Sequence, residues 1–219
     1  MSKTSDYTAL GPLVGFVYQI YYFLYCLLTI QDGETVSLEK IDDVGSETGE
    51  KRTYFQLKHS INSKPSAVKR MTERDTDLWK TLNMWVSIVK KQGDEAVQRQ
   101  WIANSEFVLV SNKNAENNRF FELVEAYKKD DSNWDELEKF VNNQAAKDSK
   151  KESEGEEKKN IYLYTKNVND YALKKEMLKR VTVEFESDDE LRAKIDGVIQ
   201  YGKMVPEKRV SDVRYMLIG

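Results

Sequence analysis

The stretches VSLEKIDDV at residues 36–44 and TYFQLK at residues 53–58 decide the fold. In both stretches apolar and polar residues alternate, which is the period of a β-strand whose two faces lie in different surroundings. The segment between them is polar and contains Gly45 and Gly49. Two alternating runs around a glycine-containing loop are typical of a hairpin. The sequence therefore predicts two antiparallel strands, over 36–44 and 53–58.

The segments on either side of this hairpin predict the α/β class, with a mixed central sheet flanked by helices. A helix is expected before it, ending near Ile30, and another over 75–90, where apolar residues recur at helical spacing. The elements expected after that are a strand at 107–110, helices at 120–127 and 134–141, a charged, flexible loop at 147–159, a strand at 161–164, a helix at 171–179, a strand at 181–185 and a helix at 188–201.

Length and composition exclude several classes of protein and of binding site. A chain of 219 residues is expected to form one domain over residues 1–219, with core motifs within 11–115 and a strand–helix elaboration over 160–219. One cysteine and one histidine exclude an intrachain disulfide framework and a cysteine-rich zinc site. No glycine-rich phosphate loop is present. Because the formal charge is −3, any binding to nucleic acid must depend on a local basic patch.

The segment from Leu13 to Ile30 carries no charge over 18 residues, which reaches the lower limit for a membrane span. It contains Gln19, Thr29 and four tyrosines, and no basic cluster flanks it. Tyrosine favours the membrane interface rather than its centre. We therefore expect a core helix, no membrane partner and, without a targeting signal or disulfides, a cytoplasmic protein.

The hairpin carries a set of polar side chains that suits metal-assisted phosphodiester hydrolysis. Gln56 and Lys58 are two residues apart and project from one strand face, and Glu39 shares a face with Asp43 on the other strand. Antiparallel pairing brings the two strands together in a register that the sequence leaves open. Mg²⁺, or alternatively Mn²⁺, takes oxygen ligands such as Asp43, Glu39 and Gln56, and a lysine beside it can support the attacking water. The same spacing also fits an ordinary surface hairpin.

A basic stretch from Lys51 to Arg74 holds seven lysines and arginines against one acidic residue. Within it, Lys64, Lys69 and Arg70 are candidates for contacts with DNA phosphates. The alternative is a solvated loop between the hairpin and the next helix.

Four blocks in sequence order resemble one known family: GxxYQ at 15–19, LExxDDV at 38–44, FQLKHS at 55–60 and DLWKTLxxW at 77–85. They resemble the nuclease domain of the CD-NTase-associated effector endonucleases, which also occurs in Lamassu-type antiphage systems. This domain is similar to the Mrr-like branch of the PD-(D/E)XK superfamily. The resemblance implies a restriction-endonuclease-like core and Mg²⁺-dependent cleavage of double-stranded DNA.

The resemblance also assigns roles by position. Asp43 matches the family's metal-binding aspartate and Lys58 its catalytic lysine. Gln56 stands where many relatives carry a carboxylate, which leaves the number of metal ions open. Glu39 matches the acidic residue before the aspartate pair, and Gln19 matches a polar residue of the first helix that faces the active site.

Two neighbours of these residues are expected to support them. Asp42 precedes the metal-binding aspartate, and His59 follows the catalytic lysine. By strand alternation His59 points away from Lys58, so a hydrogen-bonded structural histidine is the simpler interpretation.

The leading hypothesis is therefore an Mg²⁺-dependent endodeoxyribonuclease, acting as the effector of a bacterial defence system. Its control would come from a sensor or ATPase subunit, from homo-oligomerisation, or from a C-terminal sensor domain outside this sequence. The alternative is a catalytically inactive nuclease-fold subunit that binds DNA or serves as a scaffold. An enzyme of RNA or single-stranded DNA ranks last, because aromatic and basic residues are not interleaved as base stacking requires.

Overall fold

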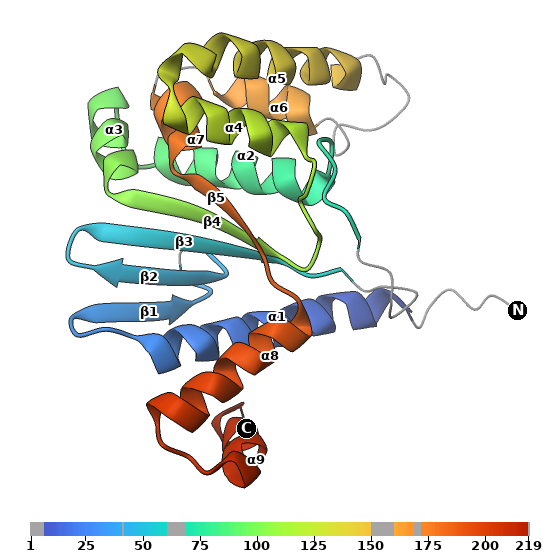
Figure 1. Ribbon diagram of the computed structural model, residues 1–219. Coiled ribbons are helices and arrows are strands. Elements are labelled where there is room, and N and C mark those ends of the chain that lie inside the picture. The colour runs from blue at the N-terminus through green and yellow to red at the C-terminus, as the bar shows by residue number, and fades with distance from the viewer. Residues whose placement is uncertain (1–6, 41, 61–68, 150–159, 169–171, 219) are drawn as a thin grey trace, which may run out of the picture. The chain divides into compact units, whose positions relative to one another are not determined.

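A computed structural model describes residues 7–218, except 41, 61–68, 150–159 and 169–171 (Figure 1). The described strands form one sheet in the order β1-β2-β3-β4-β5. The ranges of these strands are β1 Glu34–Leu38, β2 Val44–Thr48, β3 Lys51–Lys58, β4 Ser105–Ser111 and β5 Val181–Phe185. With helices in the same chain, this confirms the predicted α/β class. By contacts within the chain it divides into two compact units, which are described separately.

The first unit comprises residues 1–69, 110–114 and 183–219. In it, β1, β2 and β3 form an antiparallel meander, with Leu38 opposite Val44 and Val44 opposite Phe55. Gly49 turns the chain between β2 and β3 at φ 60°, a conformation that glycine adopts without steric cost.

The single strand predicted over 36–44 is wrong. The chain instead turns between β1 and β2, and Gly45, expected in a loop, lies in β2. Glu39 adopts φ 56° and its N–H donates to the carbonyl of Asp43 at 3.0 Å. Asp42 Oδ1 accepts the N–H of Asp43 at 2.9 Å. Local hydrogen bonds of this kind let an acidic stretch form a turn in place of a strand.

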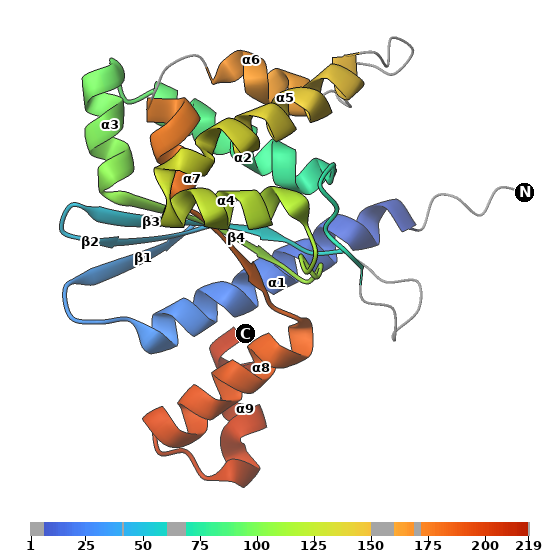
Figure 2. The ribbon, with the colours of Figure 1, turned by 45° about the horizontal axis from the view of Figure 1, so that its top comes forward.

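Helix α1 (Tyr7–Thr29) packs against the meander and beside α8 (Asp188–Gly197) (Figure 2). The ring of Tyr22 lies 5.4 Å from that of Phe55, centroid to centroid. A capping box of Ser187 and Glu190 begins α8. A π-helical turn, Val198–Gly202, follows α8, and α9 (Glu207–Ile218) ends the unit.

One described helical stretch, Gly11–Thr29, is long and apolar enough to cross a membrane by length and composition. In the structure Tyr18 and Tyr22 of this helix are buried, whereas Leu13 is 57% exposed and Phe16 46% exposed. The expectation of a core helix therefore holds for one side of α1 only.

The second unit comprises residues 70–109 and 115–182. Trp79 is fully buried in this unit, and its ring centroid lies 4.9 Å from that of Phe120 and 5.4 Å from that of Tyr164. Asp75 begins the second helix by accepting the N–H of Asp77. The helices described in this unit are α2 Thr76–Lys90, α3 Glu95–Ala103, α4 Arg119–Lys129, α5 Trp134–Ser149, α6 Asn160–Asn167 and α7 Met177–Lys179.

Several predicted elements of the second unit need correction. The strand predicted at 161–164 is wrong, because α6 covers it with Ile161 and Tyr164 buried three residues apart on one helix face. The first three residues of the predicted loop 147–159 belong to α5, and the rest lie outside the described residues. The predicted helix at 171–179 has a π-helical part, Ala172–Glu176, before α7.

Candidate functional site

Asp43 and Gln56 meet at the end of the β2–β3 hairpin. Because Val44 pairs with Phe55, the residue before β2 lies opposite the residue after Phe55. Gln56 Nε2 donates a hydrogen bond to Asp43 Oδ2. The N–H of Leu57 donates to the same oxygen at 2.8 Å. Asp43 and Gln56, which are 13 positions apart in the sequence, are therefore in direct contact.

Lys58 follows two residues later, so its side chain projects from the same face of β3 as Gln56. Gln56 is buried, and Asp43 and Lys58 are half-buried. Across the described residues, the Lys58 ammonium makes no hydrogen bond or ion pair. The arrangement brings one carboxylate, one amide and an ammonium that has no partner in the described part of the chain to the end of the β2–β3 hairpin.

The two other acidic residues of this region lie in the β1–β2 turn. Glu39 is exposed there, so the face-sharing with Asp43 that a continuous strand would give does not occur. Asp42 is buried and holds the turn through its hydrogen bond to the Asp43 N–H. In this structure Asp42, rather than Glu39, is the carboxylate that touches Asp43.

Gln19 lies on α1, which packs against the face of β3 that carries Phe55. Strand alternation directs Gln56 and Lys58 to the opposite face. No hydrogen bond of Gln19 to either residue is present in the described parts of the chain. The structure therefore does not bring Gln19 to the group formed by Asp43, Gln56 and Lys58.

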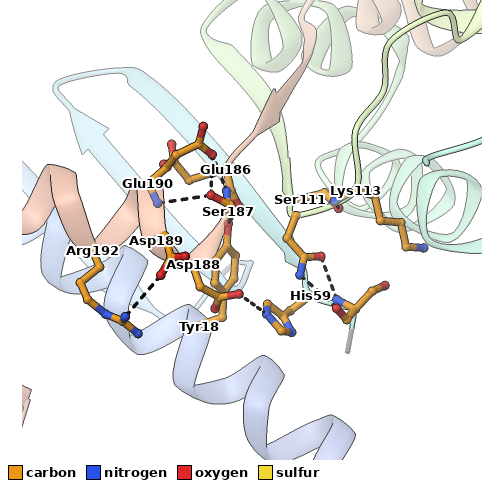
Figure 3. A network of polar contacts seen from close by, with 12 residues as sticks. Tyr18, His59, Ser111, Lys113, Glu186, Ser187, Asp188, Asp189, Glu190 and Arg192 are labelled. Atoms are coloured by element: carbon orange, nitrogen blue, oxygen red, sulfur yellow. Dashed lines mark hydrogen bonds and ion pairs between the residues drawn. The ribbon is translucent and has the colours of Figure 1, made fainter. Parts of the chain in front are cut away.

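His59 lies between α1 and α8 (Figure 3). Its Nε2 is 2.9 Å from Asp188 Oδ2, and its ring lies 5.2 Å from that of Tyr18. The hydrogen bond with His59 holds the pKa of Asp188 below its usual value. Tyr18 in turn donates its hydroxyl to the carbonyl of Glu186 at 2.7 Å. His59 thus ties the end of β3 to two helices.

A second set of contacts fixes the backbone next to Lys58. Ser111 Oγ donates to the carbonyl of Lys58 at 3.0 Å. Asn112 forms a pair of hydrogen bonds with the backbone of Ser60, accepting its N–H at 2.9 Å and donating to its carbonyl at 3.0 Å. Sequence reasoning missed both residues, although polar residues directly after an apolar strand were a visible signal.

The predicted phosphate contacts are only partly described. Lys69 and Arg70 are exposed, and Lys64 lies outside the described residues. The carbonyl of Lys69 accepts the N–H of Asn114 at 2.8 Å, which fixes the backbone at that position.

The residues of the site fit an ion that keeps several water ligands better than an ion whose ligands all come from the protein. Nowhere in the described ranges do three histidine, cysteine, aspartate or glutamate side chains gather as metal ligands. Asp43 Oδ2 is engaged by two donors, whereas no hydrogen bond to Oδ1 is present among the described residues. Mg²⁺ keeps several waters and binds through one or two carboxylates plus substrate phosphate. Asp43 is compatible with that mode through Oδ1, whereas Gln56 directs its amide nitrogen at Asp43 Oδ2 and would have to turn its amide to offer an oxygen.

Comparison with known proteins gives one informative likeness. No protein-family model matches the sequence, and no curated protein matches it. Among solved structures, a Cap4 SAVED/CARF-domain containing receptor from Moraxella osloensis is 16% identical, with a TM-score of 0.51. The match covers 94% of this chain and 42% of that chain. The likeness shows a shared fold, and the chain spans less than half the length of that receptor.

Proposed function

We propose that this chain is a metal-dependent endonuclease domain that cuts double-stranded DNA as the effector part of an antiphage defence system. The observation that carries the proposal is the direct contact of Asp43 with Gln56, with Lys58 on the same strand face. The ordered sequence blocks that resemble CD-NTase-associated effectors support it. The fold-level likeness to a Cap4 receptor agrees with a defence-related role.

Each residue has a chemical task in this proposal. Asp43 and the amide oxygen of Gln56 would hold Mg²⁺ or Mn²⁺, next to the turn that contains Asp42 and Glu39. The ion supplies charge neutralisation and a bound water of lowered pKa. The Lys58 ammonium would orient the attacking water and stabilise charge on the phosphate. Ser111 holds the backbone carbonyl of Lys58, which fixes the position from which the side chain extends.

A nuclease of this kind needs a receptor that controls when it cuts DNA. The matched neighbour is described as a receptor, and this chain corresponds to less than half of it. We propose that a sensor portion, a sensor or ATPase subunit, or assembly of several copies in the cytoplasm turns cleavage on.

A second candidate function is a nuclease-fold subunit that binds DNA without cutting it. The observation in its favour is that both donors at Asp43 Oδ2 come from the protein itself. An amide at position 56 also binds a metal more weakly than a carboxylate would.

A plasmid cleavage assay separates the two. Wild type is compared with Asp43→Ala and Lys58→Ala in Mg²⁺ or Mn²⁺, with the natural partner and trigger present. Lys208→Ala, which removes an exposed lysine on α9, is the matched control. We expect wild type and control to nick plasmid, and both site variants to lose cleavage while keeping their circular dichroism spectra. Plasmid that is bound but left uncut by wild type would establish the second candidate.

A further inference from the structure

The side of α1 that faces away from the meander is apolar. Tyr18 and Tyr22 form the buried side of the helix. On the opposite side, apolar residues recur at alternating intervals of three and four positions, and we call them the α1 seam: Leu13, Phe16, Ile20, Phe23 and Leu27. The first two and the last are exposed, and the two between them are half-buried. Alternating intervals of three and four are the pattern by which one helix packs along another.

The exposed apolar surface is large enough for a stable interface. Val17 flanks the seam, and Ile30 continues it just past the end of α1. The exposed side chains on this side are Leu13, Phe16, Val17, Leu27 and Ile30, which are 57%, 46%, 43%, 40% and 41% exposed. At about 200 Å² for a fully exposed side chain of this size, they leave roughly 450 Å² of apolar surface on one copy. An interface of standard size buries about 800 Å² on each partner, slightly more than half of it apolar, so this side of α1 supplies the apolar area that one half of a dimer needs.

A second copy of the chain is the occupant that the seam fits. Every residue of α1 is uncharged, so two copies can meet along this helix without burying an unpaired charge. Leu13 and Leu27 each lie seven positions from Ile20, so the spacing of the seam is the same in both directions along the helix. A two-fold dimer requires such self-complementarity, because the same patch lies on both sides of the interface.

A membrane is the other environment that an apolar helix can enter. Helices that lie in a membrane interface carry lysines and arginines on their polar side, and α1 has neither. Its buried side is also held by protein, because the Tyr18 hydroxyl donates to the Glu186 carbonyl and the Tyr22 ring packs on Phe55. These features favour a protein partner over lipid.

We propose that this chain forms a two-fold dimer in which the α1 helices of two copies pack against each other along the seam. Association removes the exposed leucine and phenylalanine side chains from water, which is the main favourable contribution to binding. The proposal does not depend on the nuclease activity, since an oligomeric state is measured without DNA.

Sedimentation equilibrium of the full chain over a concentration series tests the dimer. Leu13→Lys and Phe16→Lys place a charge in the seam, where its burial without a partner is unfavourable. Val97→Lys makes the same kind of change on α3, at an apolar residue that is 44% exposed, and is the matched control. We expect wild type and control to dimerise, and each seam variant to dimerise at least about tenfold more weakly while keeping its circular dichroism spectrum.

A disulfide experiment gives a readout that does not depend on weakening the dimer. Ile20→Cys, combined with Cys26→Ser, should cross-link to its counterpart under mild oxidation, because the middle residue of the seam faces its own copy in either helix orientation. Val97→Cys in the same background should remain a monomer on a non-reducing gel.

Four results would overturn the proposal. The first is a wild type that stays monomeric at about 100 μM, which exceeds the μM-to-pM dissociation constants of interfaces of this size. The second is a dimer that both lysine variants of the seam preserve. The third is the absence of a cross-link in Ile20→Cys. The fourth is flotation of wild type with phosphatidylcholine–phosphatidylglycerol vesicles that Phe16→Lys abolishes, which would assign this side of α1 to a membrane.

Discussion

At the scale of single residues, Asp43 has two roles that substitution can separate. Its Oδ2 accepts hydrogen bonds from Gln56 and from the Leu57 N–H, so the carboxylate stabilises the hairpin end as well as being the proposed metal ligand. An asparagine keeps an acceptor oxygen at this position but has no negative charge.

We expect Asp43→Ala to lower the free energy of unfolding by about 1–3 kcal/mol, because it leaves donors without their acceptor. Asp43→Asn is expected to cost less than about 1 kcal/mol and still to abolish cleavage. Urea unfolding, followed by the plasmid assay, measures both quantities. Full cleavage by a folded Asp43→Asn variant would contradict the role of the carboxylate as metal ligand.

The Asp188–His59 contact predicts a dependence of stability on pH. The pKa of Asp188 is lowered in the folded state by its hydrogen bond with His59. A lowered carboxyl pKa contributes stability above the unfolded value of about 3.9, and this contribution disappears as pH falls through the folded value. Because the Asp188 side chain is 52% exposed, solvent screening limits the effect to less than about 1 kcal/mol.

Urea midpoints of wild type and Asp188→Asn between about pH 7 and about pH 3 test this dependence. The variant should lose less stability on acidification than wild type. Parallel acid profiles of the two proteins would show that the contact does not contribute.

The sequence could predict part of this site. The alternation in TYFQLK gave the shared face of Gln56 and Lys58, because strand alternation is a local property. The contact of Asp43 with Gln56 depended on register, which the turn at Gly49 determines. Glu39 could not be placed, because local hydrogen bonds interrupt the strand pattern at that residue.

At the scale of elements, two glycines in different backbone conformations make a matched pair. Gly49 has φ 60° and Gly197 lies in α8, and a Cβ at either would meet no atom within 4 Å. The change in stability caused by alanine at either position therefore depends on the backbone conformation and not on a steric clash.

Gly49→Ala is expected to lower stability by about 1 kcal/mol, because alanine is strained in the left-handed region. Gly197→Ala is expected to raise stability by up to about 1 kcal/mol, because alanine favours a helix. Thermal unfolding of both variants measures the difference. A gain of stability in Gly49→Ala would contradict the left-handed conformation of the turn, and a loss in Gly197→Ala would contradict its place in a helix.

The cap of α8 gives a second prediction at this scale. Ser187 accepts the N–H of Glu190, and the Glu190 carboxylate accepts the N–H of Ser187. Ser187→Ala should cost about 1 kcal/mol, as expected for the loss of an N-cap. Ser211→Ala, at an exposed position of α9, should cost much less in the same unfolding experiment.

The elements that sequence patterns predicted well are those with a clear period. Helix α2 matches its predicted range to within one residue, and the predicted strand 181–185 matches β5. Residues 161–164 were assigned to a strand because a short apolar run does not distinguish a strand from a buried helix turn. Helices α3 and α9 were missed, because neither has a continuous apolar stripe: the buried residues are Gln98 and Ile102 in α3, and Val210 and Arg214 in α9.

At the scale of the whole molecule, the charge predicts how DNA affinity responds to salt. The formal charge is −3, so attraction to phosphate depends on the predicted contacts Lys64, Lys69 and Arg70. Neutralising three phosphates gives a slope of about −3 for log K against log salt concentration.

Fluorescence anisotropy with labelled duplex DNA at several salt concentrations measures this slope. Lys69→Ala should reduce its magnitude by about one, and Lys208→Ala should leave it unchanged. An unchanged slope for Lys69→Ala would remove that residue from the DNA surface.

The hydrogen bond between Tyr22 and Glu184 joins residues 162 positions apart in the sequence. During translation at 5–20 residues per second, the ribosome makes the second partner roughly 8–32 seconds after the first. Throughout that interval the tyrosine side of α1 has no α8 or β5 to cover it. Until β5 and α8 have been made, the meander alone can cover this side of α1, and the apolar surface that it leaves uncovered is open to chaperones that hold such segments.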